Sequence, residues 1–231
     1  MTGRPAPPVL PAPLRAWLGP VAALAALVVL ALGVLYADAG APGRVDARIL
    51  AAVDGVAPPW RDVALAVDFL GEPVGAATLV VAAVTGCLLL RLPRAAVLVV
   101  GGVGLAVGTT KLLKSLVGRT IHGEENLSFP SGHTAFLTAF ALVVALLVTG
   151  RLGLGRTAGT SLVLIMGLLA GTAMGWAQVA LGAHYPTDAL GGWSTALAVV
   201  PATAWLVDRT ADRLAGRTAE RTADAGRRAR R

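Results

Sequence analysis

The sequence predicts an all-α integral membrane protein, a bundle of about six transmembrane helices with both termini in the cytoplasm. Three observations lead to this prediction. The 231 residues are 55% hydrophobic and 14% charged, with a mean hydropathy of +0.71, which is far from the soluble average. Long apolar stretches recur along the whole chain. The arginines between these stretches gather on alternate connections, which indicates one preferred orientation in the membrane.

Six stretches are long and apolar enough to cross a hydrocarbon core of about 30 Å. They run approximately over residues 18–37, 73–92, 95–116, 133–148, 159–182 and 187–207. Each must be helical, because an unpaired backbone N–H or C=O group in lipid costs several kcal/mol. The chain then divides into a Pro-rich N-terminal arm (1–17), a six-helix membrane domain (18–207) and an Arg-rich cytoplasmic tail (208–231).

The first stretch has a second interpretation, as a cleaved secretory signal. Arg4 and Arg15 precede it, and the small residues around Asp38 resemble a cleavage site. The apolar region of a signal runs over about 7–15 residues. Because residues 18–37 exceed that length, we expect a membrane helix.

Arginine placement orients the bundle in the cell membrane. Most of the 20 lysines and arginines lie before the first span, between the second and third, between the fourth and fifth, or after the last. The positive-inside rule places these segments in the cytoplasm, and an even number of spans agrees. The extracytoplasmic side then carries residues 38–72, 119–132 and 183–186.

The remaining segments predict little chemistry. The tail, with its repeated Arg-Thr-Ala triplets, is expected to be disordered or to lie on the membrane surface. Its arginines could attract anionic lipid headgroups at about 1 kcal/mol each, or only fix the topology. Residues 47–53 are expected to form a short interfacial helix on the outer side, and the N-terminal arm is expected to be loose.

The polar residues inside the domain are unevenly distributed. All three histidines (His122, His133, His184) and both lysines (Lys111, Lys114) fall within residues 111–184, at the outer ends of four expected spans. A single histidine near a helix end is usually structural, and lysines there usually extend to the interface. Their convergence on one side of the membrane instead favours a functional site.

The sequence "SFPSGH" at residues 128–133 opens the fourth expected span. Pro130 can start a helix, which leaves the amides of Ser131, Gly132 and His133 unpaired at the positive end of the helix dipole. Such a terminus binds anions, phosphate above all. Gly132 lets the backbone approach a ligand, and Ser131 adds a hydroxyl donor.

A second cluster, "GAHYPTDALGG" at residues 182–192, opens the last span. Asp188 follows His184 by four residues, so its carboxylate can accept from one imidazole nitrogen and leave the other free to attack. One histidine as nucleophile and another as acid form a constellation suited to phosphoryl transfer.

With these two motifs the chain resembles the type 2 phosphatidic acid phosphatase superfamily of membrane lipid phosphatases. The resemblance rests on Pro130-Ser131-Gly132-His133 and on the His184–Asp188 spacing. It implies a reaction without metal or cofactor, in which His184 attacks phosphorus through a phosphohistidine intermediate and Asp188 orients it. His133 protonates the leaving lipid alkoxide, and Ser131 with the Gly132 amide holds the phosphoryl oxygens. The implied partner is a phosphorylated membrane lipid, not a nucleic acid.

The family also places two arginines on the phosphoryl group, and here both positions differ. Ile121 lies seven residues after Lys114, and Gln178 lies six residues before His184. Arg119 is the nearest substitute, Lys111 could turn inward beside Lys114, and Gln178 can donate hydrogen bonds without bringing a charge. We therefore predict phosphate contacts from these side chains.

The alternative is a relative that binds a phosphorylated lipid without hydrolysing it, or a membrane scaffold. One transition-state arginine can change phosphoryl-transfer rates by roughly 10³–10⁵, so losing both could silence an enzyme. A binding protein, however, needs neither a nucleophile with its orienting carboxylate nor a separate acid. A transporter is less favoured, because the spans carry no charge near their middle.

Overall fold

The computed structural model describes residues 7–53 and 57–228. These residues form α1 (Arg15–Leu35), α2 (Arg44–Val53), α3 (Pro58–Phe69), α4 (Pro73–Leu89), α5 (Pro93–Val117), α6 (Gly132–Leu152), α7 (Arg156–Ala180) and α8 (Pro186–Arg228), with a 3₁₀ turn at Ala12–Leu14. The all-helical class is therefore confirmed. Arg4, which precedes the first apolar stretch, lies outside the described residues.

The predicted spans correspond to helices of the structure. Within the described residues, α1 with its preceding turn, α5, α6, α7 and α8 are each long and apolar enough to cross a membrane. The helices α3 and α4 meet the same test only as a pair, and they are bent by 54° at the intervening residues. The sequence predicted the α4 part of this span but not α3. Outward-facing leucines, such as Leu24, Leu27 and Leu30 on α1, are exposed as lipid contact requires.

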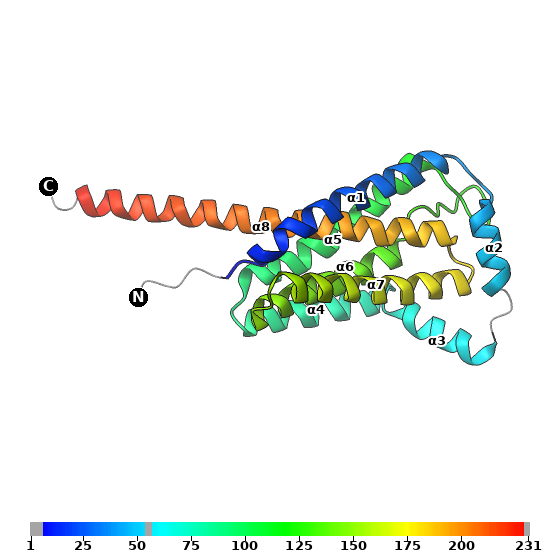
Figure 1. Ribbon diagram of the computed structural model, residues 1–231, viewed down its shortest axis with the longest axis horizontal. Coiled ribbons are helices and arrows are strands. Elements are labelled where there is room, and N and C mark those ends of the chain that lie inside the picture. Colours follow the sequence, from blue (N-terminus) through cyan, green and yellow to red (C-terminus); the bar gives the residue numbers. More distant parts are fainter. Residues whose placement is uncertain (1–6, 54–56, 229–231) are drawn as a thin grey trace.

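The helix α8 is the centre of the bundle, because it packs against α1, α5, α6 and α7. The start of α1 and the C-terminal end of α8 lie at one end of the molecule, and α2 lies at the other (Figure 1). This arrangement agrees with an even number of crossings. The polar motifs fall at the α2 end, because α5 and α7 finish there while α6 and α8 begin there.

The N-terminal arm is not loose over its described part, which corrects the expectation for this segment. Val9, Leu10 and Leu14 are buried. The amides of Val9 and Leu10 each donate to the Asp208 carboxylate at 2.9 Å, and Arg94 lies 3.6 Å from the same carboxylate. Hydrogen bonds to the Asp208 carboxylate and apolar burial therefore hold the arm against the bundle.

The tail is also more ordered than expected, because α8 continues as one helix to Arg228 and projects beyond the bundle (Figure 1). Over residues 208–228 the disordered alternative is therefore wrong. Alanine and arginine are good helix formers, and the helix is already nucleated inside the membrane domain.

Candidate active site

The N-terminus of α6 forms the floor of the candidate site. Ser131 is the N-cap, and its Oγ accepts from the amide of Thr134 at 3.3 Å. The helix therefore begins at Gly132, later than Pro130 suggested. The Ser131 amide donates to the carbonyl of Asp188 at 2.9 Å, so the unpaired first-turn amides are those of Gly132 and His133. Ser131 itself is fully buried, and its hydroxyl caps the helix.

Close backbone approach explains two glycines at the site. A Cβ on Gly192 of α8 would collide with the carbonyl of Ser131, and a Cβ on Gly71, between α3 and α4, would collide with the His133 ring. Glycine at these positions lets the start of α6 lie directly against α8 and lets the α3–α4 bend pass over His133.

His184 lies in the short loop between α7 and α8, beside the α6 terminus. Its Nδ1 is 3.6 Å from the Asp188 carboxylate, which is slightly longer than a hydrogen bond and typical of a site without substrate. His184 is buried, and burial is the main cause that lowers its pKa. Asp188 opposes this shift, whereas Lys114 and His133 add to it. A neutral imidazole with Nδ1 towards Asp188 leaves Nε2 free as a nucleophile.

Arg119 lies behind Asp188 and not in the open site, which corrects the prediction that it contacts phosphate. One terminal nitrogen donates to Asp188 at 2.6 Å, and the other donates to Asp46 of α2 at 2.7 Å. The guanidinium stacks over Tyr36 at 3.9 Å and Tyr185 at 4.5 Å, and the side chain is fully buried. Two carboxylates and two rings therefore enclose Arg119, and its guanidinium is not exposed to the open site.

His133 faces two carboxylates of the α3–α4 bend. Its Nε2 lies 3.8 Å from Asp68 and 3.6 Å from Glu72, and this nitrogen is buried without a hydrogen-bond partner. The donor atoms of the three residues lie within 4.8 Å of one another, close enough to hold a cation. Exposed carboxylates often gather without one, and Glu72 is half exposed.

The other predicted phosphate ligands differ in their availability. Lys114 is half-buried near His184 and Asp188, and its Nζ donates to the Leu127 carbonyl at 2.6 Å. Lys111, one turn earlier on α5, is exposed. Gln178 is buried and donates its amide to Asp68, so its nitrogen is already committed. Lys114 is thus the predicted cation that lies beside the histidines.

The structure therefore brings His133, His184, Asp188 and Lys114 together, holds Arg119 behind Asp188, and leaves Lys111 exposed. A tetrahedral anion beside the Gly132 amide would meet a neutral nucleophile, a second imidazole and one ammonium group. Such an arrangement can transfer a phosphoryl group to nitrogen and protonate the leaving oxygen. The remaining histidine, His122, is exposed and donates from its ring to the Gly182 carbonyl at 2.7 Å.

Sequence reasoning missed the acidic residues that contact this cluster. Asp46 lies 73 residues before its partner Arg119, and Asp68 lies 110 residues before Gln178. Residues 38–72 were expected on the same side of the membrane as the histidines, with no role for either carboxylate. No periodicity marks these carboxylates, because their partners are brought together by the packing of α2 and α3 on the bundle.

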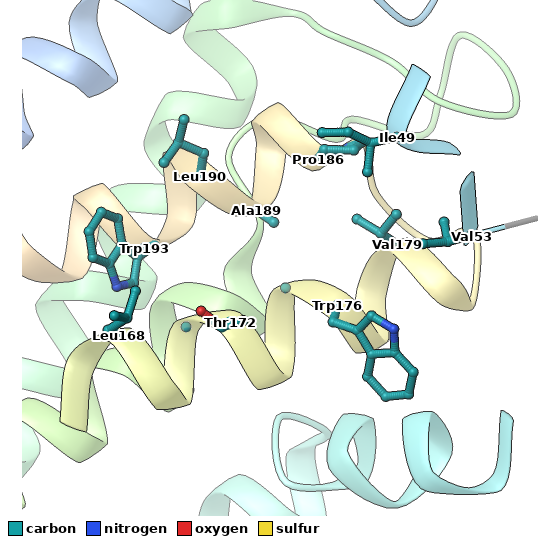
Figure 2. A pocket seen from close by; sticks show the side chains of 12 residues that line it. Ile49, Val53, Leu168, Thr172, Trp176, Val179, Pro186, Ala189, Leu190 and Trp193 are labelled. Atoms are coloured by element: carbon teal, nitrogen blue, oxygen red, sulfur yellow. The ribbon is translucent and has the colours of Figure 1, made fainter. Parts of the chain in front are cut away.

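An apolar pocket of about 360 Å³ lies between α7 and α8, next to α2 (Figure 2). Its α8 lining, Pro186, Ala189, Leu190 and Trp193, follows a helical i, i+3, i+4, i+7 pattern. Asp188 belongs to a different face of the same helix. The pocket is therefore lined mainly by apolar side chains and is separate from the histidine cluster.

Comparison with known proteins gives two findings and one absence. A family model described as the PAP2 superfamily matches residues 95–212. One similar solved structure is described as the crystal structure of the first transmembrane PAP2 type phosphatidylglycerolphosphate phosphatase from Bacillus subtilis. It is 24% identical, with a TM-score of 0.64 over 83% of this chain and 96% of that chain. Comparison with curated protein sequences gave no significant match.

Proposed function

The chain belongs to the PAP2 superfamily, and from that premise we propose that it hydrolyses a phosphate monoester or diphosphate of a membrane lipid with a histidine nucleophile. Family membership and the likeness to a membrane phosphatase support lipid phosphatase activity in general. The observation that carries the finer proposal is the pair of imidazoles at the start of α6 and α8. One is backed by Asp188 at 3.6 Å.

The reaction proceeds in two steps. His184 Nε2 forms a bond to phosphorus, and the bond from phosphorus to the leaving oxygen breaks with its electron pair on that oxygen. The leaving group is the lipid alkoxide of a monoester or the lipid monophosphate of a diphosphate, and His133 gives its oxygen a proton. Water then attacks the phosphohistidine, His133 takes up a proton from it, and His184 leaves with inorganic phosphate as the product. Each step uses one group as general acid or base, which typically raises the rate by about 10²–10⁴-fold.

Charge on the phosphoryl oxygens is stabilised by Lys114 and by the unpaired amides at the start of α6. A hydrogen bond to a charged group is worth about 1.5–3 kcal/mol, so these donors together offset part of what two arginines would supply. The proposed reaction needs no metal to generate the nucleophile, because a neutral imidazole nitrogen attacks without deprotonation.

The substrate class follows from the position of the site. His133 and His184 lie at the starts of α6 and α8, at one end of the bundle, and a helix that spans the hydrocarbon core brings such an end near the lipid headgroups. The phosphatidylglycerolphosphate phosphatase named above acts on one such lipid. A phosphatidylglycerol phosphate, a phosphatidic acid or a polyprenyl diphosphate would each present its phosphate there.

Phosphate release from vesicles tests the proposal. Purified protein in vesicles that contain one of these three lipids is expected to release inorganic phosphate from at least one, with equal rates with and without a chelator. Vesicles without protein are the control. Release at the control rate from every lipid would favour the binding-only alternative. If a chelator abolishes phosphate release and added magnesium restores it, the metal-independent histidine mechanism is contradicted. Asp68, Glu72 and His133 would then be the candidate metal ligands.

The orientation in the cell membrane is a separate proposal, with the site on the extracytoplasmic side and both termini in the cytoplasm. In a Cys87→Ala background, Glu125→Cys and Thr157→Cys place single thiols at exposed positions on opposite ends of the bundle. An impermeant maleimide added to intact cells is expected to label the first and not the second. The reverse pattern would place the site in the cytoplasm and exclude substrates of the outer leaflet.

A further inference from the structure

Asp46 is the one buried residue of α2 within the described part of the chain. Its neighbours Val45 and Ile49 are exposed by 56% and 41%, and no apolar residue of this helix is fully buried, so apolar burial contributes little to holding it to the bundle. The carboxylate instead accepts from the amide and the hydroxyl of Thr187, both at 2.9 Å. It also accepts from Arg119 at 2.7 Å and from the Gly43 amide at 3.2 Å.

This carboxylate changes the charge that His184 experiences. Arg119 bridges Asp46 and Asp188, with both ion pairs at zero exposure. With Asp188 alone, Arg119 would form a neutral pair, and the imidazole would face no net charge from it. Two carboxylates around one guanidinium leave a net charge of −1. Buried charges interact strongly because water does not screen them, so this difference reaches the neighbouring ring.

We propose that Asp46 is a positioning residue for phosphoryl transfer, which holds Asp188 behind His184 through Arg119 and Thr187 and keeps this network negatively charged. The inference rests on the proposed function. When Nε2 bonds to phosphorus, the imidazole with its Nδ1–H becomes cationic, while the lipid oxygen leaves with the bonding electrons and receives a proton from His133. A negative network stabilises the cationic ring, whereas a neutral pair would not.

Several charged or titratable groups face His184 and set its proton affinity. Asp188 comes from α8, Lys114 from α5 and His133 from α6. Arg119 and Asp46 lie behind Asp188. Asp68 and Glu72 lie on the far side of His133. Removing the charge of Asp46 should therefore lower the pKa of His184, and removing that of Arg119 should raise it.

Three substitutions separate charge from packing. Asp46→Asn removes one negative charge, Asp46→Glu keeps it, and Asp46→Asn combined with Arg119→Gln restores the net charge of −1. Asp62→Asn on the exposed face of α3 is the matched control. We expect Asp46→Asn to lower kcat on the order of 10- to 100-fold, the range for partners that act through another ligand, with little change in KM. The double variant should recover most of this loss.

A second measurement does not depend on turnover. Diethyl pyrocarbonate modifies neutral imidazole, so the pH dependence of His184 modification, followed by mass spectrometry, reports its apparent pKa in substrate-free protein. The expected order is Asp46→Asn below wild type, with Asp46→Glu and the double variant close to wild type. If Asp46→Asn does not fold, the charge-restoring double variant still tests the network, because its His184 pKa should stay close to that of wild type and a clear shift would contradict the inference.

Two results would overturn the inference. In the first, all three Asp46 variants keep the kcat and the apparent His184 pKa of wild type. In the second, the kcat of the double variant is no higher than that of Asp46→Asn, and the His184 pKa is the same in all variants. The latter result would assign Asp46 a packing role only. Wild-type protein that hydrolyses no lipid would contradict the proposed function instead, and the pKa order would still test the network.

Discussion

Replacement of His184 by alanine is expected to lower phosphate release on the order of 10⁴-fold or more, because the variant lacks the atom that forms the covalent bond. Rapid quenching of wild-type protein with labelled lipid phosphate should trap an acid-labile phosphoryl group on His184, identified by mass spectrometry. The variant should trap none. His122→Ala is the control, because this exposed histidine lies outside the cluster and should leave release close to wild type.

The pH dependence of the same reaction follows from burial. Burial lowers the pKa of His184 below its ordinary value of 6.5, and the neutral form is the nucleophile. Activity is therefore retained at pH 6.5 and is lost only as the pH falls through the lower pKa of the folded protein. Asp188→Asn removes the group that opposes burial, so the acidic limb of kcat/KM should move to still lower pH. Full release by His184→Ala, or a label on another residue, would contradict this mechanism.

The fold was predictable because lipid imposes simple rules on a sequence. Span length and the demand for satisfied backbone groups give the helices directly, and α1, α5, α6, α7 and α8 appear where apolar stretches predicted them. The rules fail at the chain ends and at the interface. The arm packs through Asp208, and α3 is too short and polar to register as a span.

The site was predictable where its residues are close in sequence. The four-residue spacing of His184 and Asp188, and the run from Pro130 to His133, reflect single helix termini. These motifs indicated the superfamily that residues 95–212 match. Contacts between distant segments could not be read in this way. Arg119 has a favourable position in the sequence, yet its buried partner Asp46 comes from α2 and holds it behind Asp188.

The position of Arg119 also changes what its removal should do. Removal of an arginine that contacts the phosphate would mainly raise the free energy of the transition state. A guanidinium buried between Asp46 and Asp188 instead leaves two uncompensated carboxylates when it is lost, and breaking a buried pair typically costs about 3–5 kcal/mol of folding free energy. This is why the network is tested by paired substitutions and not by alanine at Arg119.

His133→Gln is expected to lower release from a lipid phosphate by about 10²–10⁴-fold, the range for a lost general acid. The physical reason lies in the leaving group: a lipid alkoxide is a strong base and must be protonated as it departs. Nitrophenyl phosphate provides the comparison, because nitrophenolate leaves without a proton. With this substrate, the first step in the variant should remain close to wild type.

The two substrates together separate the possible roles of His133. Because the same imidazole serves as base when water attacks the phosphohistidine, the variant should release one nitrophenolate per protein in a burst and then turn over slowly, with the label held on His184. Equal losses on both substrates without a burst would instead assign His133 to phosphate binding. The carboxylates of Asp68 and Glu72 lie 3.8 and 3.6 Å from its Nε2 and would then be the nearest groups able to protonate the leaving oxygen. Asp68→Asn and Glu72→Gln would identify which of the two does so.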